Sequence, residues 1–407
     1  MVEKQITVVG LGYIGLPTAI ILAKAGHHVM GYDAKKEVTD SLKQGKIHIV
    51  ENHLQEAFDE VYQNGHLQIK EELPVSDIYI LCVPTPFYKG QNEKKADLSY
   101  VFAGAKQIGS VLKQGDLVIL ESTVPPHTTS HMSTILAETS GLREDRFYTA
   151  HCPERVLPGR ILYELTHNDR IIGAASPQAR QMTKELYESF VSEGTCYVCD
   201  DVTAEMCKLV ENTYRDINIA FANQLSMLCD CSGVNVHELI TLANKHPRVN
   251  ILQPGLGVGG HCLAVDPWFL VEAYQDQSSL IKTAREINDA KPYWIKDKIK
   301  QQIKVGSKIG ILGMAYKPNI DDMRESPSLV LAKALQEEGY KVYGCEPNSK
   351  ADQIQGIPLL SLSDILNDCD CLVVALAHKE FMEPAIKEQI LHKTHIDCIG
   401  YDELSAS

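Results

Sequence analysis

The feature that most constrains this chain is a glycine-rich turn near its N-terminus, Gly10-Leu11-Gly12-Tyr13-Ile14-Gly15. The short apolar run Ile6–Val9 precedes the turn, and a segment of helical composition from Pro17 to Ala25 follows it. Glycines at this spacing permit a tight turn, a close approach of the backbone to a pyrophosphate, and close packing of helix on strand. The new helix also presents free N–H groups and the positive end of its dipole. The pattern predicts a dinucleotide-binding βαβ unit rather than a purely structural turn.

An acidic residue indicates which dinucleotide binds. The second strand, expected over His28–Tyr32, ends on Asp33, about twenty residues beyond the turn, where an acid usually accepts hydrogen bonds from ribose hydroxyls and repels a 2′-phosphate. We therefore expect NAD as the cofactor. Lys35 and Lys36 follow closely and keep NADP open as the alternative.

The rest of the chain alternates between two kinds of pattern. Further strands are expected at 78–83, 117–120 and 147–150, with helical stretches between them, as in a doubly wound parallel sheet. From Thr203, a plausible N-cap, the pattern becomes a long helix over 203–230, followed by helices at 235–246 and 278–302. The stretch 250–268 is rich in glycine and proline and is not expected to form regular helix. A second α/β unit begins near Lys308, with strands at 309–313, 341–345 and 371–375.

The length of 407 residues also exceeds what one compact core usually holds. We therefore predict an α/β fold with two Rossmann-like doubly wound domains joined by a central helical region. The expected boundaries are 1–202 for the NAD-binding domain, 203–303 for the central region and 304–407 for the C-terminal domain.

Composition narrows the classes of partner. The formal net charge of −14 argues against general nucleic-acid binding, although an anionic small substrate needs only a few local cations. No apolar run is long enough for a membrane helix, and a strand begins almost at once, so we expect no signal peptide and a cytoplasmic location. The twelve cysteines are expected to be thiols rather than disulfides. Cys196 and Cys199, Cys229 and Cys231, and Cys369 and Cys371 are expected to be small buried residues, and no metal site is predicted.

One cysteine differs from the others because it lies in a glycine loop, Gly257-Val258-Gly259-Gly260-His261-Cys262. Flexible backbone there could bring N–H groups close to a ligand, and Asp266 and Pro267 follow within one turn. Beside a nicotinamide-binding domain, a thiolate could trap an aldehyde as a thiohemiacetal, which could then lose a hydride. Cys262 is therefore a candidate nucleophile. His261 is not assigned as the base, because neighbours in an extended loop usually point apart.

A polar stripe marks the central helix. Glu205, Lys208, Asn212 and Arg215 follow one another at intervals of 3, 4 and 3 residues, which places them on one helix face. The other faces are largely apolar or small, with Met206, Leu209, Val210, Ile217, Ile219 and Ala220. A solvated face is the ordinary explanation of such a stripe, but a helix so apolar elsewhere should be buried, and its polar stripe should line a site. Lys208 is then a candidate for stabilising an alkoxide or a tetrahedral oxyanion.

At this point the sequence resembles the UDP-glucose/GDP-mannose dehydrogenase family, from the N-terminus to about residue 380. The resemblance rests on motifs in the family's order: Gly10–Pro17, Val83–Pro86, Glu121–Pro125, Cys152–Arg155, Ala204–Arg215, Gly257–Pro267, and Tyr316-Lys317 through Asp322–Pro327. It implies an NAD-binding N-terminal domain, a central helical region that forms a homodimer, and a C-terminal Rossmann-like domain that holds UDP. The implied reaction oxidises a sugar C6 alcohol twice to a uronic acid and consumes two NAD.

The resemblance also implies residue roles. Cys262 would be the nucleophile, Lys208 and Asn212 would stabilise the oxygen that becomes negative, and Asp266 and Thr123 would position the water. Glu154 would support proton transfer. The expected NAD contacts are Gly10, Gly12, Tyr13, Ile14, Gly15, Asp33, Pro84, Thr85 and Thr123. The expected UDP-sugar contacts are Arg155, Val156, Lys208, Asn212, Arg215, Gly259, Gly260, Tyr316, Lys317, Arg324 and, from the partner subunit of the dimer, Arg248.

Three runs point to one branch within the family: His151–Gly159, Asn244–Asn250 and Ala264–Phe269. Departures from the family pattern are His127 where glycine is usual, Asn223-Gln224 in place of Asn-Glu, and the loosely matching tail Ile396–Gly400. Members acting on other sugar nucleotides, a non-catalytic sugar-nucleotide binder and a thiol redox sensor are the alternatives. The joint presence of Cys262, Lys208 and Asp266 argues against the binder. The pair Asp321 and Asp322 is expected to make ion pairs near Arg324 rather than to hold a metal.

Overall fold

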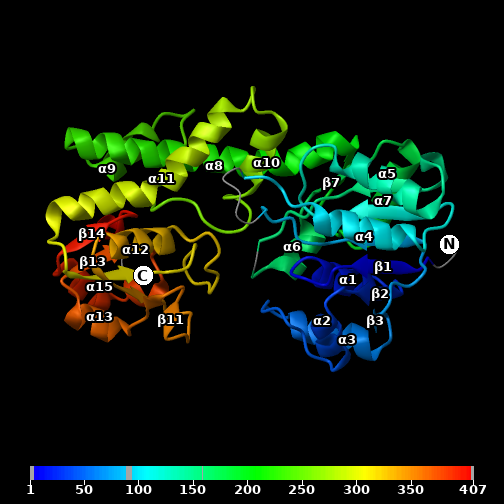
Figure 1. Ribbon diagram of the computed structural model, residues 1–407, viewed down its shortest axis with the longest axis horizontal. Helices are drawn as coiled ribbons and strands as arrows, with labels where there is room; N and C mark the ends of the chain where they lie inside the picture. Colours follow the sequence, from blue (N-terminus) through cyan, green and yellow to red (C-terminus); the bar gives the residue numbers. More distant parts are fainter. Residues whose placement is uncertain (1–3, 89–93, 158, 405–407) are drawn as a thin grey trace. The chain divides into compact units, whose positions relative to one another are not determined.

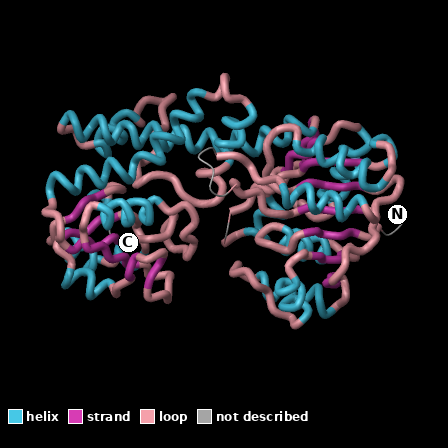
Figure 2. The backbone as a smooth tube through the Cα atoms, viewed as in Figure 1, coloured by secondary structure: helices cyan, strands magenta, loops and turns pink. Residues whose placement is uncertain are grey.

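The computed structural model describes residues 4–88, 94–157 and 159–404. The chain divides into two compact units, Met1–Val210 and Glu211–Ser407. Each unit contains its own sheet, parallel throughout or nearly so, with helices packed on it, and Figures 1 and 2 show both. The predicted α/β class with two Rossmann-like domains and a helical region between them is confirmed.

The first unit is built on one sheet with the strand order β3-β2-β1-β4-β5-β6-β7-β8. Its strands are β1 (Ile6–Val9), β2 (Val29–Tyr32), β3 (Leu67–Lys70), β4 (Ile78–Leu81), β5 (Leu117–Leu120), β6 (Tyr148–His151), β7 (Arg170–Gly173) and β8 (Cys196–Cys199). All neighbours are parallel except β6 and β7. The first six follow the dinucleotide-binding order, in which the order of strand addition reverses between β1 and β4 while the strands stay parallel. The loops after β1, β4 and β5 therefore lie at one edge of the sheet.

Helices cover both faces of this sheet. They are α1 (Gly15–Lys24), α2 (Lys36–Lys43), α3 (Leu54–Gln63), α4 (Ser99–Gly109), α5 (Thr128–Ser140), α6 (Ile161–His167) and α7 (Pro177–Glu188), and a short 3₁₀ turn spans Glu144–Arg146. Side chains of α1, α3, α6 and α7 share one apolar core, and those of α4 and α5 share the other. Helix α1 is buried from Gly15 to Ala23 because it is apolar on nearly every side. That burial fixes the position of its N-terminus.

The long helix α8 (Asp201–Ser232) starts two residues earlier than the sequence pattern predicts. Thr203 is not its N-cap. Instead, the Asp200 carboxylate accepts hydrogen bonds from the Thr203 N–H at 2.9 Å and from its hydroxyl at 2.7 Å. A carboxylate just before the first turn satisfies a free backbone donor and favours the helix dipole, so it is the stronger start signal.

The second unit combines helices with a smaller sheet. Its elements are α9 (Val236–Ala243), α10 (Asp266–Ala273), α11 (Ser279–Gln302), β9 (Lys308–Leu312), α12 (Pro327–Glu337), β10 (Lys341–Cys345), β11 (Gln353–Ile354), β12 (Ile357–Pro358), α13 (Leu362–Asp368), β13 (Cys371–Val374), α14 (Lys379–Met382), α15 (Pro384–Leu391), β14 (His395–Asp397) and a 3₁₀ turn at Tyr401–Glu403. The stretch 250–268 is irregular only up to Val265, because α10 begins at Asp266. Pro267 lies in the first turn of α10, where its missing N–H costs nothing.

The second sheet is parallel throughout and has the order β10-β9-β13-β14. The tail Ile396–Gly400 contributes to the edge strand β14. The order β10-β9-β13 repeats the β2-β1-β4 arrangement of the first unit. After β9, however, Gly313 does not lead straight into a helix, because α12 starts only at Pro327. We call the intervening segment, residues 313–326, the β9–α12 loop.

The cysteines lie within the described residues, and no disulfide joins them. The expectation of thiols is therefore confirmed. Burial raises the pKa of Cys152, Cys371 and Cys398 to about 12. Cys231 is an exception to the expected burial of the cysteine pairs, because it lies exposed near the C-terminal end of α8.

No helix among the described residues combines the length and the apolar character needed to span a bilayer. In the same part of the chain, no cluster of three or more His, Cys, Asp and Glu side chains is arranged to hold a metal ion.

Candidate active site

The glycine turn forms a cradle at the start of α1. Gly10 has a φ of +90°, and a Cβ there would lie 2.3 Å from the Cys82 carbonyl oxygen. A Cβ on Gly15 would lie 1.8 Å from the Gly10 carbonyl oxygen, whereas a Cβ on Gly12 would meet no atom within 4 Å. Packing therefore requires the first and third glycines, and the second leaves open backbone. Since no side chain caps α1, its N–H groups and this open surface suit a dinucleotide pyrophosphate.

Asp33 is held at the carboxyl edge of the same sheet. Its Oδ2 accepts a hydrogen bond from the Leu11 N–H at 2.8 Å, and its Oδ1 accepts one from the Lys35 N–H, also at 2.8 Å. The carboxylate is thereby fixed between the glycine turn and the residues after β2. An ionised carboxylate accepts about four hydrogen bonds, so it retains capacity for the two hydroxyls of a ribose.

The loops after β4 and β5 are tied to each other. The Ser122 hydroxyl accepts a hydrogen bond from the Val83 N–H at 2.9 Å and donates one to the Val83 carbonyl at 2.7 Å. The Thr85 hydroxyl donates to the Thr123 carbonyl at 2.7 Å. Pro84, Thr85 and Thr123, which sequence reasoning assigned to the cofactor from separate motifs, are thus brought together.

Glu121 holds several elements of the first unit together, although sequence reasoning assigned it no role beyond its place in the motif Glu121–Pro125. Its buried carboxylate accepts hydrogen bonds from the Thr18 hydroxyl, the Tyr187 hydroxyl and the Cys82 thiol, each at 3.0 Å. Burial raises the pKa of Glu121, and the nearby Arg170 guanidinium opposes that rise. The carboxylate thus connects α1 and α7 with the end of β4. The signal available in the sequence was a glutamate, Glu121, placed directly after the apolar strand β5.

Lys208 and Glu154 meet in the first unit. The Lys208 Nζ lies 3.5 Å from Glu154 Oε1, and both side chains are largely buried. Glu154 Oε2 accepts a hydrogen bond from the Val156 N–H at 2.7 Å, which fixes the carboxylate on its own loop. Arg155 donates from Nη1 to the Asp169 carbonyl at 3.2 Å. Of the predicted site residues, Lys208, Glu154 and Val156 are brought together here.

Glu205 does not share the role predicted for the polar stripe of α8. It is almost fully buried, and its Oε2 accepts a hydrogen bond from the His127 N–H at 2.6 Å. Its Oε1 accepts from the Thr129 N–H at 2.7 Å and from the Thr129 hydroxyl at 2.6 Å. Glu205 therefore caps α5 instead of lining a ligand site. His127 has a left-handed φ of 71°, which explains why the resembled family usually has glycine there.

Asn212 contacts the start of α10. Its Nδ2 donates to Asp266 Oδ2 at 2.6 Å, and Asp266 is buried. Lys208 precedes Asn212 by one turn of α8, and Arg215 follows as an exposed side chain. Asn212 and Asp266, predicted as catalytic from separate motifs, are therefore direct partners.

Cys262 is half-buried in the glycine loop, and its carbonyl accepts hydrogen bonds from the N–H groups of Val265 at 2.9 Å and Asp266 at 2.8 Å. Gly260 has a φ of +85°, and a Cβ there would lie 2.9 Å from the Tyr316 ring. Burial raises the pKa of Tyr316, and the negative charges of Asp322 and Cys262 add to the rise. The cysteine loop therefore packs against the β9–α12 loop within the second unit.

The β9–α12 loop carries charged side chains. Arg324 donates to the Asp322 carboxylate from Nε at 3.0 Å and from Nη2 at 2.6 Å. Burial raises the pKa of Asp322, but the hydrogen bonds from Arg324 outweigh it and hold the pKa below its usual value. The predicted ion pairing with Arg324 is confirmed for Asp322. The Arg324 carbonyl also accepts a hydrogen bond from the Gly260 N–H at 2.9 Å, and the Lys317 side chain is exposed.

Arg248 lies at the exposed tip of the loop between Asn244 and Ile251. The Asn244 side chain closes the base of this loop, because its Nδ2 donates to the Ile251 carbonyl at 3.0 Å and its Oδ1 accepts from the Ile251 N–H at 2.7 Å. The loop is thus held in shape while it presents Arg248 outward.

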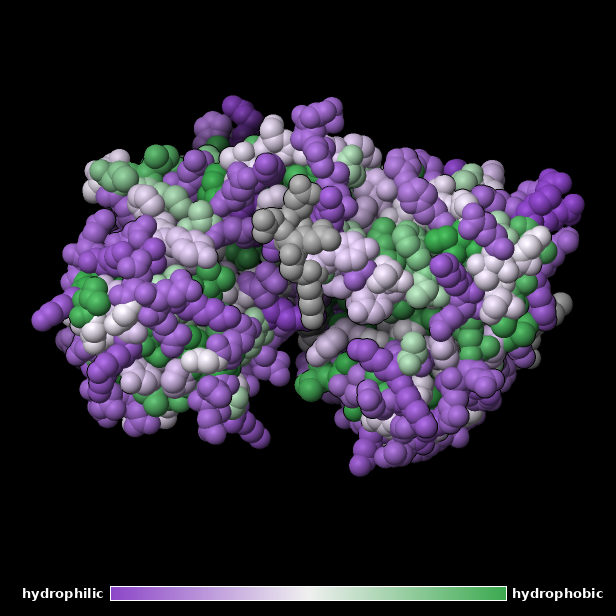
Figure 3. Space-filling view, viewed as in Figure 1, coloured by the Kyte–Doolittle hydropathy of each residue, from purple (hydrophilic) through white to green (hydrophobic). Residues whose placement is uncertain are grey.

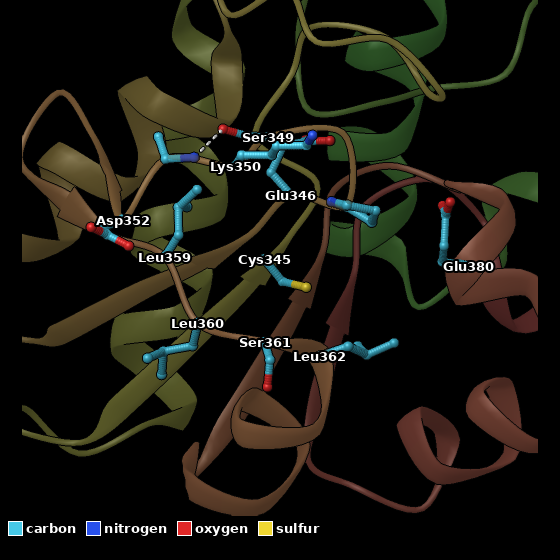
Figure 4. A pocket seen from close by; sticks show the side chains of 12 residues that line it. Cys345, Glu346, Ser349, Lys350, Asp352, Leu359, Leu360, Ser361, Leu362 and Glu380 are labelled. Carbon is cyan, nitrogen blue, oxygen red and sulfur yellow. Dashed lines mark hydrogen bonds between the residues drawn. The ribbon is translucent and has the colours of Figure 1, made fainter.

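A cavity of about 390 Å³ lies at the carboxyl end of β10 (Figure 4). Side chains after β10 and around the start of α13 line it, with Glu380 from α14 on the opposite side. None of the site residues predicted from the sequence lines this cavity.

Comparison with known proteins gives consistent matches over the whole chain. Residues 4–191, 202–290 and 310–401 match the NAD-binding, central and UDP-binding domain models of the UDP-glucose/GDP-mannose dehydrogenase family. A Ralstonia solanacearum protein named NDP-N-acetyl-D-galactosaminuronic acid dehydrogenase is 47% identical over 93% of this chain and 92% of its own. The UDP-N-acetyl-D-mannosamine dehydrogenase of Campylobacter jejuni is 47% identical over 93% and 97%. A solved UDP-D-ManNAc dehydrogenase from Pyrococcus horikoshii superposes with a TM-score of 0.87 at 40% identity, covering 98% of this chain and 96% of its own.

Proposed function

The chain belongs to the UDP-glucose/GDP-mannose dehydrogenase family, and we propose that it oxidises the C6 alcohol of UDP-N-acetyl-D-mannosamine to the uronic acid. It is an NAD-dependent oxidoreductase of that family. The choice of sugar is supported by the relatives from Campylobacter jejuni and Pyrococcus horikoshii. It is also supported by the runs His151–Gly159, Asn244–Asn250 and Ala264–Phe269, which resemble that branch. The observation that carries the proposal is a dinucleotide cradle in the same chain as a buried Lys208 and a loop thiol, Cys262.

Bound on the glycine turn, NAD would accept a hydride from the substrate carbon in each of two oxidations. The cradle around Gly12, Tyr13 and Ile14 would hold its pyrophosphate, and Asp33 would hold its ribose. Pro84, Thr85 and Thr123, which lie together at the ends of β4 and β5, would border the nicotinamide end.

Lys208 acts in both oxidations. As the C6 alcohol loses its proton, the ammonium group stabilises the developing alkoxide, and the Asn212 amide donates a second hydrogen bond to that oxygen. Before substrate arrives, Glu154 holds this ammonium group at 3.5 Å. The same carboxylate supports the proton transfer that releases the final product.

Cys262 makes the second oxidation possible. Its thiolate adds to the aldehyde carbon, forming a carbon–sulfur bond and an alkoxide that Lys208 stabilises. Loss of the second hydride converts this thiohemiacetal into a thioester. A water molecule positioned by Asp266 and Thr123 then attacks the thioester carbonyl, the carbon–sulfur bond breaks, and the acid leaves while the thiolate is restored. The sugar carbon loses four electrons in all.

The UDP part of the substrate would be held by cations and loop backbone. Arg215 and Lys317 present positive charge at exposed positions, where a diphosphate would neutralise them. Arg324 is also exposed and would contact the diphosphate from its ion pair with Asp322. The remaining proposed contacts are Arg155, Val156, Gly259, Gly260 and Tyr316.

We propose a homodimer in which Arg248 reaches the sugar site of the partner subunit. Helix α8 supports it, because Tyr214, Phe221 and Leu228 recur every seven residues and are 69%, 52% and 59% exposed. A heptad stripe of large apolar side chains is typical of a helix that packs on another helix. In the space-filling view, apolar surface is visible over the region of α8 and α9 (Figure 3). The division into 1–202, 203–303 and 304–407 remains part of this proposal, with the central part as the dimer region.

A second candidate substrate is the nucleotide-linked N-acetylgalactosamine derivative. The observation in its favour is the Ralstonia solanacearum relative, which has the same 47% identity as the Campylobacter jejuni one. UDP-N-acetylglucosamine and UDP-glucose are further alternatives.

The test is a substrate panel. The purified protein would be mixed with NAD and, separately, with UDP-N-acetylmannosamine and the corresponding N-acetylgalactosamine, N-acetylglucosamine and glucose nucleotides, and NADH would be followed by absorbance. We expect two NADH per N-acetylmannosamine nucleotide and the highest kcat/KM for that sugar. Turnover restricted to another sugar would transfer the assignment to that substrate. The same reaction with NADP tests the preference attributed to Asp33.

A further inference from the structure

Four polar side chains form a buried network between α8 and α11. Asp216 and Asn223 come from α8, Arg285 and Asn288 come from α11, and each is at most 1% exposed. Arg285 Nη1 donates to Asp216 Oδ1 at 2.5 Å, and Asn288 Nδ2 donates to the same oxygen at 2.8 Å. Asn223 Nδ2 then donates to Asn288 Oδ1 at 2.9 Å. The network is therefore a continuous chain of hydrogen bonds from a guanidinium to an amide. We call these four side chains the α8–α11 relay.

The relay contacts the backbone on either side of the glycine loop Gly257–Cys262, once two residues before the loop and once directly after Cys262. At the near end, Asn223 Oδ1 accepts a hydrogen bond from the Gly255 N–H at 2.8 Å. At the far end, Arg285 Nη1 reaches the carbonyl of Leu263, the residue after Cys262, at 3.5 Å. The loop also lies directly against α11, because a Cβ on Gly257 would be 2.8 Å from the Asn288 carbonyl oxygen.

The chemistry of the four groups sets one direction for every bond. An ionised Asp216 only accepts, so Asn288 must turn its NH₂ toward it and its oxygen toward Asn223. Asn223 must then present its own NH₂ to Asn288, which leaves its oxygen for the Gly255 N–H. The buried charge pair thus determines which amide atom faces the loop.

Stability alone does not account for such a network. Well-packed apolar side chains in place of a buried ion pair are often as stabilising or more so. What buried polar groups add is a defined geometry. Among the described residues, Asp216 Oδ2 and Arg285 Nε lack a hydrogen-bond partner, so the geometry rests on the bonds through Asp216 Oδ1 and the two amides. Here the network fixes the backbone at Gly255 and Leu263, which precede and follow Cys262 in the chain.

We propose that Asn223, Asn288, Asp216 and Arg285 are positioning residues that fix the glycine loop and thereby aim the Cys262 thiol. This inference rests on the proposed function, in which Cys262 is the nucleophile of the second oxidation. The first oxidation needs no thiol. Loss of the relay should therefore slow the second hydride transfer more than the first, whereas a general loss of folded protein would reduce both equally.

The experiment compares Asn223→Ser with a matched control, Ser226→Ala. Ser226 accepts a buried hydrogen bond from Lys291, so the control also removes a polar contact between α8 and α11. Its hydroxyl donates to the Asn223 backbone carbonyl within α8 and not to any of the relay side chains. Each variant would be mixed with NAD and UDP-sugar in a single-turnover experiment that resolves the two NADH phases. In parallel, iodoacetamide labelling of the Cys262 peptide would be timed by mass spectrometry.

For Asn223→Ser we expect the second phase to slow about tenfold or more, because small displacements of a reacting group cost one to two orders of magnitude. The first phase should stay within about twofold of wild type, and the labelling rate of Cys262 should change. Ser226→Ala should leave the ratio of the phases and the labelling rate unchanged. Equal slowing of both phases in Asn223→Ser, or an unchanged labelling rate, would overturn the proposal.

A second variant covers the case in which Asn223→Ser does not fold. Arg285→Lys keeps a positive charge beside Asp216 but lacks the planar fork that also reaches Leu263, and it should likewise slow the second phase selectively. Failure of the proposed function itself has a different signature, because Cys262→Ser would then still yield acid with two NADH.

Discussion

The Lys208 Nζ lies 3.5 Å from Glu154 Oε1, and the two side chains are only 8% and 12% exposed. A pair this buried gains little net stability, because desolvation offsets much of the attraction. The pair does fix the Lys208 ammonium group in one orientation and largely shields it from water. An oxygen that acquires negative charge nearby meets a preformed partner instead of one that must first shed water.

The first prediction concerns that cation. Lys208→Met should lower kcat by about 10²–10³-fold, because one preorganised stabilising group is worth that much in comparable sites. The affinity for NAD, measured by fluorescence titration, should stay close to wild type. Lys184→Met is the matched control, because Lys184 makes an ion pair with Glu188 on the surface of α7. If both variants retained wild-type kcat, Lys208 would have no role in the chemistry.

The second prediction concerns the thiol. Cys262→Ser should abolish formation of the free acid, because a serine hydroxyl gives a stable ester or no adduct at all. The product of a long incubation would be analysed by mass spectrometry for acid and for protein-bound sugar. Cys231→Ser removes an exposed thiol from the same unit and should leave turnover unchanged. Acid made at the normal rate by Cys262→Ser would exclude the thioester route.

The third prediction concerns the dimer. Arg248→Ala and Cys262→Ala should each be inactive as homodimers. If Arg248 completes the partner's site, mixed dimers contain one site with both residues intact, and a randomised mixture should recover about a quarter of wild-type activity. The mixture would be made by co-expression and assayed for NADH formation. Absence of recovery would place Arg248 in the site of its own subunit.

The fourth prediction concerns stability at low pH. His151 at the end of β6 is fully buried, and burial lowers its pKa from 6.5 to about 3. As pH falls, the unfolded chain therefore takes up this proton before the folded protein does. The stability contributed by the neutral imidazole is complete above pH 6.5 and declines as pH falls toward 3, by about 2 kcal/mol between pH 7 and pH 5.

Urea unfolding of wild type and His151→Leu at both pH values would measure this. The wild type should lose about 2 kcal/mol more than the variant between pH 7 and pH 5. The comparison isolates His151, because the buried acids titrate in both proteins. Equal losses in the two proteins would mean that His151 titrates normally.

Local patterns predicted most of the framework. Strand β5, the turn from Gly10 to Gly15 and helix α11 are specified by residues close together in sequence, and their expected bounds agree with the structure within one or two residues. Asp200 was missed as the start of α8 because Asp200 and Thr203 can each cap a helix N-terminus, and the sequence does not show which of the two does so. Contacts between distant residues were missed for a different reason.

Glu205 illustrates that second reason. Its helical spacing with Lys208 is correct, but its partner Thr129 lies 76 residues away, and no periodicity reports such a pairing. Asn223 and Asn288 are similar, since each is an ordinary amide until the other is placed against it. The sequence therefore located the candidate chemistry, and the structure was needed to locate the residues that hold it.

The β9–α12 loop has a consequence for how the protein handles electrons. The two sheets share one winding, but only the first unit takes the chain from its glycine turn directly into a helix. The second unit opens that junction into a segment with Tyr316, Lys317 and Arg324. With one NAD bound on the glycine turn at a time, the four electrons leave the sugar in two separate hydride transfers. NADH must be exchanged for NAD between the two transfers, while the sugar is still at the aldehyde level. Flux through the enzyme should therefore follow the cellular ratio of NAD to NADH more steeply than in a single-step dehydrogenase.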